Sequence, residues 1–530
     1  MKVSRVVILD GYTDEPAGLG VPPYIGTYPR LIAGSLWLHD KSIRIHYFTI
    51  DEARKNPELF VNKCLESDQI YFIAGAEVPG RYIGGKPITL EEIERFSILL
   101  SEKTRILVGP AAKFGLGLGG GSQAYSRKRL ERLFDHIVPG DIEIFITEAL
   151  KHGFERAEPW RLRENYTIAN EAFRLGSAII RQHPNYGWNL IVEIETFRGC
   201  PRYVTGGCSF CIEPRYGNVL FREPKDVIKE IEALYQNGAI HFRIGKQPDI
   251  LAYKAIDTGK EEFPKPNIRE LEKLFHGIRS VAPGLKVLHI DNVNPGTIAH
   301  HPETSREALK IIIKYHTPGD VAALGIESFD PKVIKRNNLK VMPEEALAAI
   351  RIINEIGARR GWNGLPELLP GVNLLYGLPG ETKETYRINY EYLKKILDEG
   401  LLLRRINIRK VSVLENTPLW ARRDEVNYLI KKHDRLYRSY RIKIMQEIDQ
   451  PMMKRLVPPN IIVKYLFTET YQEGFTIARQ PASYPIVFKI RGKIELKKIV
   501  SVKPIKYASK SILAEIIGEK EISNTRSHHQ

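Results

Sequence analysis

The stretch that decides the fold is Phe197-Arg-Gly-Cys-Pro-Arg-Tyr-Val-Thr-Gly-Gly-Cys-Ser-Phe-Cys-Ile-Glu-Pro-Arg215. It holds three of the four cysteines in 530 residues, Cys200, Cys208 and Cys211, in the spacing Cys-x7-Cys-x2-Cys. An apolar, alternating segment from Trp188 to Thr196 precedes it and is typical of a β-strand. The cysteines therefore follow the carboxyl end of a strand on a glycine-rich loop, which is where α/β folds build their sites.

Three clustered thiolates suit a metal ion or an iron–sulfur cluster. An iron–sulfur cube takes one thiolate per iron, so three thiolates would leave one iron open to a substrate or cofactor. A tetrahedral zinc site would need a fourth ligand, and the nearest histidines, His183 and His241, lie outside the loop. Two alternatives stay open here: a disulfide with one spare thiol, or a zinc site closed by a distant histidine.

Composition sets the class of protein. The length predicts two to four domains, and four cysteines argue against a disulfide scaffold. The chain has no run of eighteen apolar residues and begins with a strand-like segment, so we expect a cytoplasmic protein with no membrane partner. A net charge of +16 favours an anionic partner, with nucleic acid first; the alternative is the Lys/Arg/Glu-rich surface of a thermophile's protein.

Residues 1–150 alternate strand and helix signals, which predicts a Rossmann-like, doubly wound domain. The expected strands are Val3–Leu9, Arg44–Thr49, Gln69–Ala74 and Arg105–Val108, and the expected helices lie near Arg30–His39, Asp51–Leu65 and Thr89–Ser101. The glycine-rich run that ends at Gly115–Gly121 loosely resembles a nucleotide loop, but a flexible connection explains it equally well.

Residues 151–187 read as a linker with a helix, and residues 188–420 repeat strand, loop and helix six times. This pattern predicts an α/β fold whose parallel sheet curves into a full or partial barrel. After Trp188–Thr196 the expected strands are Ile240–Ile244, Lys286–Asp291, Val321–Ile326, Gly371–Tyr376 and Arg405–Val413, with helices at Pro224–Gln236, Ile268–Val281 and Pro343–Ile356. Gln247, Asp291, Glu327 and Gly377 follow strand ends, as the cysteines do, which suggests one shared site.

The C-terminal part changes character. Residues 421–473 are helical and basic, and the basic face either contacts phosphates or is simply solvated. Residues 474–516 alternate in the manner of a small antiparallel β module, with runs at Ile486–Ile490, Ile494–Val502 and Ile512–Ile516 and a turn at Lys503-Pro504. Its basic residues, interleaved with Tyr484, Phe488 and Tyr507, suggest an OB-like surface for nucleic acid or a basic capping domain. Residues 517–530 are expected to be disordered.

Taken together, these motifs resemble those of the radical S-adenosylmethionine (radical SAM) enzymes. Phe210 stands just before the third cysteine, as in that family, and Gly245-Lys-Gln-Pro248 stands where the family has Gly-Gly-Glu-Pro. The resemblance continues in the family's order over about 230 residues, through Gly325-Ile-Glu-Ser-Phe-Asp330, Val333-Ile-Lys-Arg-Asn-Asn338, Leu375-Tyr-Gly-Leu-Pro-Gly-Glu-Thr382 and Leu414-Glu-Asn-Thr-Pro-Leu419.

The resemblance implies a partial (β/α)6 barrel with a 4Fe-4S cluster on Cys200, Cys208 and Cys211. S-adenosylmethionine (SAM) would bind the open iron, and one electron from a donor such as ferredoxin or flavodoxin would cleave it to methionine and a 5′-deoxyadenosyl radical that abstracts hydrogen. By motif position, the residues near SAM would be Gly245, Lys246, Gln247 and Pro248 at its amino group, Glu327 and Ser328 at its ribose or carboxylate, and Gly377 and Val413 at its adenine.

Two features depart from the family pattern. The usual spacing is Cys-x3-Cys-x2-Cys, whereas the first gap here is seven residues. Gln247 replaces the usual acid; its amide oxygen can still accept a hydrogen bond from an ammonium group, more weakly than a carboxylate.

The flanking domains also resemble modules found in this superfamily. The N-terminal domain stands where some members have a cobalamin-binding domain. Asp10-Gly-Tyr-Thr-Asp-Glu15 lacks the histidine of their Asp-x-His-x-x-Gly motif, so cobalamin could bind only without that ligand.

The C-terminal module resembles the TRAM domain of tRNA methylthiotransferases. Those enzymes need three further cysteines and only Cys64 remains, so ordinary methylthiotransfer is not expected and Cys64 is interpreted as a buried thiol.

The sequence therefore predicts a radical SAM enzyme that modifies RNA, with tRNA as the expected substrate. Two rivals are kept. One is a radical SAM enzyme acting on a small molecule, with or without cobalamin. The other is a non-catalytic RNA-binding protein with a structural metal site.

Overall fold

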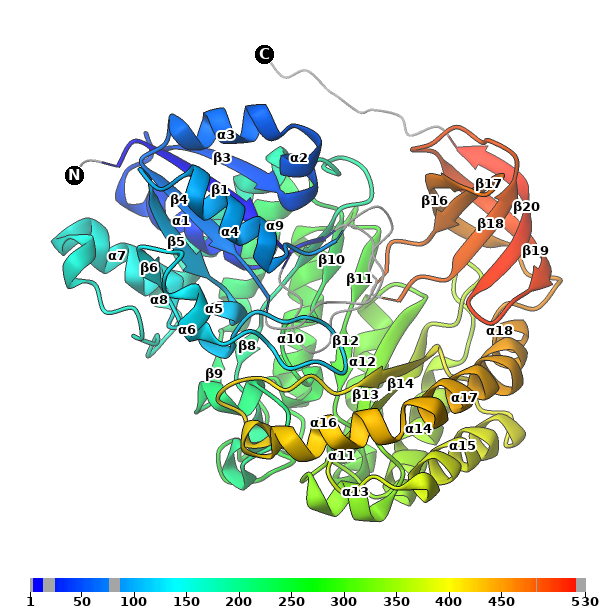
Figure 1. Ribbon diagram of the computed structural model, residues 1–530. Coiled ribbons are helices and arrows are strands. Elements are labelled where there is room, and N and C mark those ends of the chain that lie inside the picture. Colours follow the sequence, from blue (N-terminus) through cyan, green and yellow to red (C-terminus); the bar gives the residue numbers. More distant parts are fainter. Residues whose placement is uncertain (1–2, 13–23, 76–85, 483, 521–530) are drawn as a thin grey trace.

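The computed structural model describes residues 3–12, 24–75, 86–482 and 484–520 (Figure 1). The N-terminal domain is a parallel sheet in the order β3-β1-β4-β5-β6, which confirms the doubly wound prediction. Its strands are β1 (Arg5–Asp10), β3 (Arg44–Thr49), β4 (Gln69–Ile73), β5 (Thr104–Val108) and β6 (His136–Ile137). The short β6 was not predicted.

Helices cover both faces of this sheet, because strand side chains point alternately to opposite faces. Val7 and Leu9 pack with α2, α3 and α4, whereas Val6 and Ile8 share a core with α1. The single helix expected over Asp51–Leu65 is two helices, since Pro57 disfavours a helical conformation at Asn56. The helices up to the barrel are α1 (Tyr28–His39), α2 (Ile50–Lys55), α3 (Pro57–Leu65), α4 (Leu90–Leu99), α5 (Pro110–Phe114), α6 (Arg127–Leu130), α7 (Ile142–His152) and α8 (Thr167–Leu175).

The central domain is a curved wall made of two parallel sheets, β11-β10-β7-β2 and β12-β13-β14-β15. Between β11 and β12 the third predicted strand bends, and Asp291 just past the bend has φ +64°, so one strand passes from one sheet to the other. The strands are β2 (Tyr24–Ile25), β7 (Ile191–Glu193), β10 (His241–Arg243), β11 (Val287–His289), β12 (Asp291–Val293), β13 (Asp320–Glu327), β14 (Leu368–Tyr376) and β15 (Arg405–Lys410). This arrangement is the predicted partial barrel of six βα units.

One barrel strand comes from an unexpected place. β2 was assigned with residues 1–150 to the N-terminal domain, but Tyr24 and Ile25 pair in parallel with Ile191 and Val192 of β7. A two-residue strand gives no periodic signal, so sequence reasoning could not place it. The helices around the barrel are α9 (Pro224–Gln236), α10 (Ile268–Val281), α11 (Pro295–His300), α12 (Pro302–Tyr315), α13 (Pro331–Arg336), α14 (Pro343–Gly357) and α15 (Lys383–Asp398).

The C-terminal module is a closed five-stranded barrel in the order β16-β17-β18-β20-β19, an OB-like architecture. Helices α16 (Arg423–Lys432), α17 (Asp434–Ile444) and α18 (Gln450–Leu456) lead to it, and its strands are β16 (Val463–Gln472), β17 (Phe475–Arg479), β18 (Val487–Arg491), β19 (Ile499–Tyr507) and β20 (Ser511–Lys520). In Figure 1 this barrel (orange to red) and the N-terminal domain (blue) lie apart, each against the central barrel (green).

Three predictions for this module were wrong: its first residue, one turn and the end of its last strand. The module begins at Val463 rather than residue 474, because irregular register in β16 interrupts its alternation. The expected turn at Lys503-Pro504 lies inside β19, where the register shifts next to Pro504 and a proline is tolerated. β20 continues to Lys520, so residues 517–520 form strand and not the predicted disordered tail, and residues 521–530 lie outside the described part.

The C-terminal barrel packs on the amino ends of the central strands, opposite the edge where the cysteine loop leaves. Trp188, just before β7, stacks edge-on against Phe467 with 4.5 Å between ring centroids. His241, which begins β10, hydrogen-bonds through Nε2 to the Tyr465 hydroxyl at 2.9 Å. None of the helices in the described ranges is long and apolar enough to cross a membrane.

Candidate active site

The cysteine loop is anchored by a short ribbon in which β8 (Phe197–Arg198) pairs with β9 (Leu220–Phe221). Cys200 stands directly before a 3-10 helix, Pro201–Thr205, so the long first gap between cysteines is folded into a compact turn. Gly206 and Gly207 both have positive φ and return the chain to Cys208. The seven-residue gap thus brings the second cysteine back toward the first.

The three thiols are free, and they lie close enough together to affect one another. Burial raises the pKa of Cys200 to about 12, and the neighbouring Cys208 adds to the rise. Burial, Cys208 and Cys200 together raise the pKa of Cys211 well above its ordinary value. Because packed thiolates repel one another in a buried site, they need a positively charged group between them or beside them.

Two cations lie beside the cysteines, and neither was predicted from the sequence. The buried Arg202 donates from Nη1 to Sγ of Cys208 at 2.9 Å and from Nε to Oε1 of Glu262 at 2.7 Å. The positive charge of Lys340 lowers the pKa of Cys200 and so opposes the rise that burial causes. In the described parts of the chain, no group of three or more His, Cys, Asp or Glu side chains is arranged to hold a metal ion by itself. Three cysteines with adjacent cations fit the thiolate donors of an iron–sulfur cluster.

A cavity of about 1330 Å³ starts at Cys208 and Cys211 and extends through the central barrel to the C-terminal module. Four of the predicted SAM-binding residues line it: Gly245, Lys246, Pro248 and Glu327. Glu327 ends β13 with φ +67° next to an irregular register, a backbone conformation that is often retained at functional sites. The structure thus brings together the cysteines and half of the predicted SAM site.

Gln247 does not face this cavity, contrary to expectation. Its Oε1 accepts a hydrogen bond from Oγ1 of Thr196 at 3.0 Å, and its Nε2 donates to the Ile244 carbonyl at 2.5 Å. Instead, Asn292 from β12 supports the motif, because its Nδ2 donates to the carbonyl oxygens of Gly245 and Gln247. Gln247, at the position of the family's acid, is therefore hydrogen-bonded within the barrel wall and does not face the cavity.

The remaining predicted residues lie behind the cavity surface. Ser328 is buried, and its hydroxyl accepts from the Asp330 amide and donates to Asn389. Gly377 has φ +88° and donates its amide to Glu381 at 2.6 Å. Val413 is buried in the apolar cluster that includes Cys208. These three residues shape the site without lining the cavity, and their contact with SAM stays a prediction.

The glycine-rich run after β5 packs against the barrel. The Gly121 amide donates to the Val411 carbonyl, and a side chain at Gly120 would lie 2.7 Å from the Lys410 carbonyl oxygen. Gly119 and Gly120 also line the cavity. Residues 13–15 of the motif considered for cobalamin lie outside the described part, so cobalamin binding stays a prediction.

Two of the three aromatic residues expected to stack on RNA are buried. Phe488 is fully buried in the C-terminal barrel, and Tyr484 is 4% exposed and lines the central cavity. Tyr507 donates its hydroxyl to the Val457 carbonyl. The prediction of an aromatic RNA platform is therefore wrong for Phe488 and Tyr484, because the alternation that suggested it places them inward. Tyr507 is half-buried, and its contact with RNA stays a prediction. Cys64 is fully buried, as predicted.

Comparison with known proteins agrees with this geometry. The family model of the Radical SAM superfamily matches residues 194–393. An uncharacterised protein of Methanocaldococcus jannaschii is 46% identical over 525 residues, covering 98% of this chain and 94% of that protein. A tRNA-2-methylthio-N(6)-dimethylallyladenosine synthase of Protochlamydia amoebophila is 20% identical over 270 residues, covering 49% of this chain and 53% of that protein.

Among solved structures, the radical SAM methyltransferase TsrM from Kitasatospora setae aligns with 78% of this chain and 74% of its own chain, with 14% identity and a TM-score of 0.48.

The family match begins just before the cysteine loop and extends into α15, so it covers the cysteines and the cavity-lining residues of β10 to β14. By this match, residues 194–393 belong to the Radical SAM superfamily, and the chain carries the domain of the radical SAM enzymes.

Proposed function

We propose that the protein holds a 4Fe-4S cluster on Cys200, Cys208 and Cys211 and cleaves SAM in order to act on a substrate in the adjoining cavity. The observation that carries this proposal is that Cys208 and Cys211 open into the same cavity as Gly245, Lys246 and Glu327. When bound, the cluster and SAM would supply one-electron cleavage of SAM to methionine and a 5′-deoxyadenosyl radical.

The protein's own residues would orient the reactants and exclude water. Asn292 fixes the loop that carries Gly245 and Lys246, and Arg202 stabilises the negative charge on Cys208. Ligand sites usually measure about 300–1,000 Å³, so a cavity of about 1330 Å³ offers room for a second molecule beside SAM. Part of its lining, including Arg243, Leu374 and Ile406, is buried among the central strands, which favours a small substrate.

The test is anaerobic. The protein is reconstituted with iron and sulfide, both are quantified, and 5′-deoxyadenosine is measured after dithionite and SAM are added. We expect about four irons per chain, and 5′-deoxyadenosine that is lost in Cys208→Ala. A cluster that never cleaves SAM would contradict the proposal.

RNA modification is the second candidate. It is supported by the similarity to a tRNA methylthiotransferase and by exposed basic residues on α16 and α17, namely Lys431, Lys432, Arg435, Arg438 and Arg441. If RNA binds the basic C-terminal surface, Lys497→Ala combined with Lys498→Ala should weaken binding and reduce its salt slope by about one to two. An unchanged slope would remove the RNA candidate's main support.

A further inference from the structure

The cavity is lined by an arginine, Arg405, that is not bonded to any carboxylate of the described residues. Arg405 of β15 donates from Nη2 to Oδ1 of Asn407 at 3.2 Å, and its guanidinium lies 4.3 Å from the ring centroid of Tyr484. Among the residues that the structure describes, no carboxylate forms a hydrogen bond or an ion pair with Arg405. Most of its five N–H donors are therefore available to a ligand.

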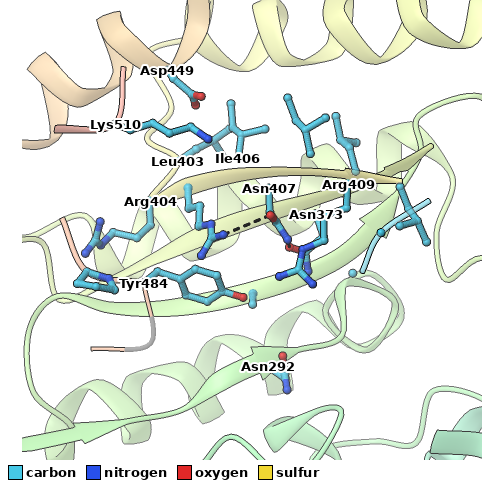
Figure 2. A pocket seen from close by; sticks show the side chains of 18 of the residues that line it. Asn292, Asn373, Leu403, Arg404, Ile406, Asn407, Arg409, Asp449, Tyr484 and Lys510 are labelled. Atoms are coloured by element: carbon cyan, nitrogen blue, oxygen red, sulfur yellow. Dashed lines mark hydrogen bonds between the residues drawn. The ribbon is translucent and has the colours of Figure 1, made fainter. Parts of the chain in front are cut away.

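Two further hydrogen-bonding groups line the same cavity, one linked to this guanidinium through Asn407 and the other in the ring that the guanidinium contacts. Asn407 donates from Nδ2 to Oδ1 of Asn373 at 3.3 Å, which leaves the Asn373 amide nitrogen without a hydrogen-bond acceptor in the described chain. The Tyr484 hydroxyl is buried and has no partner there either. Figure 2 shows Asn373 and Asn407 on the strands that line the cavity, with Tyr484 among the other lining residues.

The nearby acids are occupied or weakly ionised. Asp291 accepts from Nε of Arg243 at 2.9 Å, and Glu193 lies 3.5 Å from the same guanidinium. Burial raises the pKa of Asp449 to about 7, against the opposing effects of Lys510 and Arg405. Ten residues that line the cavity are Lys or Arg and four are Asp or Glu, so its interior attracts anions.

Leaving these groups without a ligand is costly. Burial lowers the pKa of Arg405 to about 10, and this effect outweighs the opposing effects of Tyr484, Asp291 and Asp449. A buried hydroxyl without a hydrogen bond costs about 1–3 kcal/mol. Arginine binds phosphate and carboxylate groups through two parallel hydrogen bonds, and an oxygen of such a group could also accept from Asn373 and Tyr484.

We propose that Arg405, Asn373 and Tyr484 bind an oxyanion group, either a phosphate or a carboxylate, of a small substrate molecule. The C-terminal barrel, through Tyr484, thereby forms part of the substrate site. The inference rests on the proposed function, since the bound molecule would share the cavity with Cys208 and Cys211. A small molecule is favoured over RNA because the three groups lie inside the barrel.

Binding of simple oxyanions tests this inference without cluster or SAM, so its outcome is independent of whether SAM is cleaved. Inorganic phosphate and succinate are titrated separately into the full-length protein by isothermal calorimetry at low ionic strength. We expect saturable binding of one of them, weakened about tenfold or more in Arg405→Gln. The stronger of the two identifies the group as phosphate or carboxylate.

Matched variants separate a local effect from a general one. Arg359→Gln makes the same charge change at an exposed position outside the cavity and should leave binding unchanged. Tyr484→Phe removes one oxygen atom and should weaken binding about threefold, which keeps the inference testable if Arg405→Gln does not fold. Absence of saturable binding, or equal affinity in wild type and Arg405→Gln, would overturn the inference. Arg405-dependent binding of a tRNA transcript without binding of either oxyanion would overturn the small-molecule assignment.

Discussion

Arg202 donates a hydrogen bond from Nη1 to Sγ of Cys208 over 2.9 Å, six residues along the same loop. The guanidinium is 1% exposed and is held from its other side by Glu262 and by the Asn338 carbonyl. A buried cation at a cysteine sulfur stabilises the thiolate and any cluster that it binds, because both carry negative charge. The long gap in the cysteine motif therefore positions this arginine as well as the cysteines.

The first prediction concerns this contact. Arg202→Gln removes the charge beside Cys208, and hydrogen bonds and charge near cluster sulfurs set the reduction potential. We expect a more negative midpoint potential in a redox titration monitored by electron paramagnetic resonance, with iron content kept. Arg215→Gln, in the same loop and donating to the Gly206 carbonyl, is the control. Equal potentials in wild type and Arg202→Gln would show that the contact has no electrostatic role.

Sequence reasoning found the cysteine loop and the barrel because both produce strong patterns. Strand β14 is followed by Gly377 and helix α9 begins at Pro224, and both have clear patterns of burial, although β14 begins at Leu368 and not at the predicted Gly371. Arg202 and Lys340 could not be found, because their roles depend on a fold that places α13 and its following loop beside the cysteines. A signal for the cavity was present: Arg405, Asn407 and Arg409 alternate with Ile406 and Ile408, which places polar side chains on one face of β15.

The second prediction separates stability from ligand binding at Tyr484. Its hydroxyl is buried without a partner, so removing it should relieve a desolvation penalty. We expect Tyr484→Phe to unfold at the same or a higher temperature than wild type without ligand, with a gain of up to about 1 kcal/mol. Differential scanning calorimetry measures this directly. Tyr465→Phe is the comparison, since it loses the bond to His241 and should be destabilised. A clear loss of stability in Tyr484→Phe would mean that the hydroxyl has a structural partner.

The third prediction uses the raised pKa of Asp449. Its ordinary value is 3.8 and burial raises it to about 7, so between these values the folded state binds the proton more tightly than the unfolded state. The free energy of unfolding should therefore fall as pH rises from about 4 to about 7. Asp449→Asn cannot ionise and should become more stable than wild type, by about 1–2 kcal/mol, at about pH 8 but not at about pH 4.

Thermal unfolding at several pH values checks this sign. Asp424→Asn, on the exposed face of α16, makes the same change away from the cavity and serves as the control. A stability difference between Asp449→Asn and wild type that is the same at every pH would contradict the assignment.

The fourth prediction concerns the wall between β13 and Lys340. A Cβ at Gly325 would overlap Nζ of Lys340 and lie 3.1 Å from Oε1 of Glu327. Lys340 can move because its side chain is flexible, so Gly325→Ala should fold while the SAM site is disturbed. We expect SAM affinity to fall about tenfold, equivalent to about 1.4 kcal/mol. Equilibrium dialysis with reconstituted protein measures it; unchanged affinity would place SAM away from this wall.

The most direct test of the central claim is the iron, sulfide and 5′-deoxyadenosine content of three proteins compared under anaerobic conditions: wild type, Cys208→Ala and Cys64→Ser. Cys64 lies buried in the N-terminal domain, away from the cysteine loop. We expect about four irons and SAM cleavage in wild type and Cys64→Ser, with both lost in Cys208→Ala. Iron that survives in Cys208→Ala, or a wild-type cluster that leaves SAM intact, would contradict that claim.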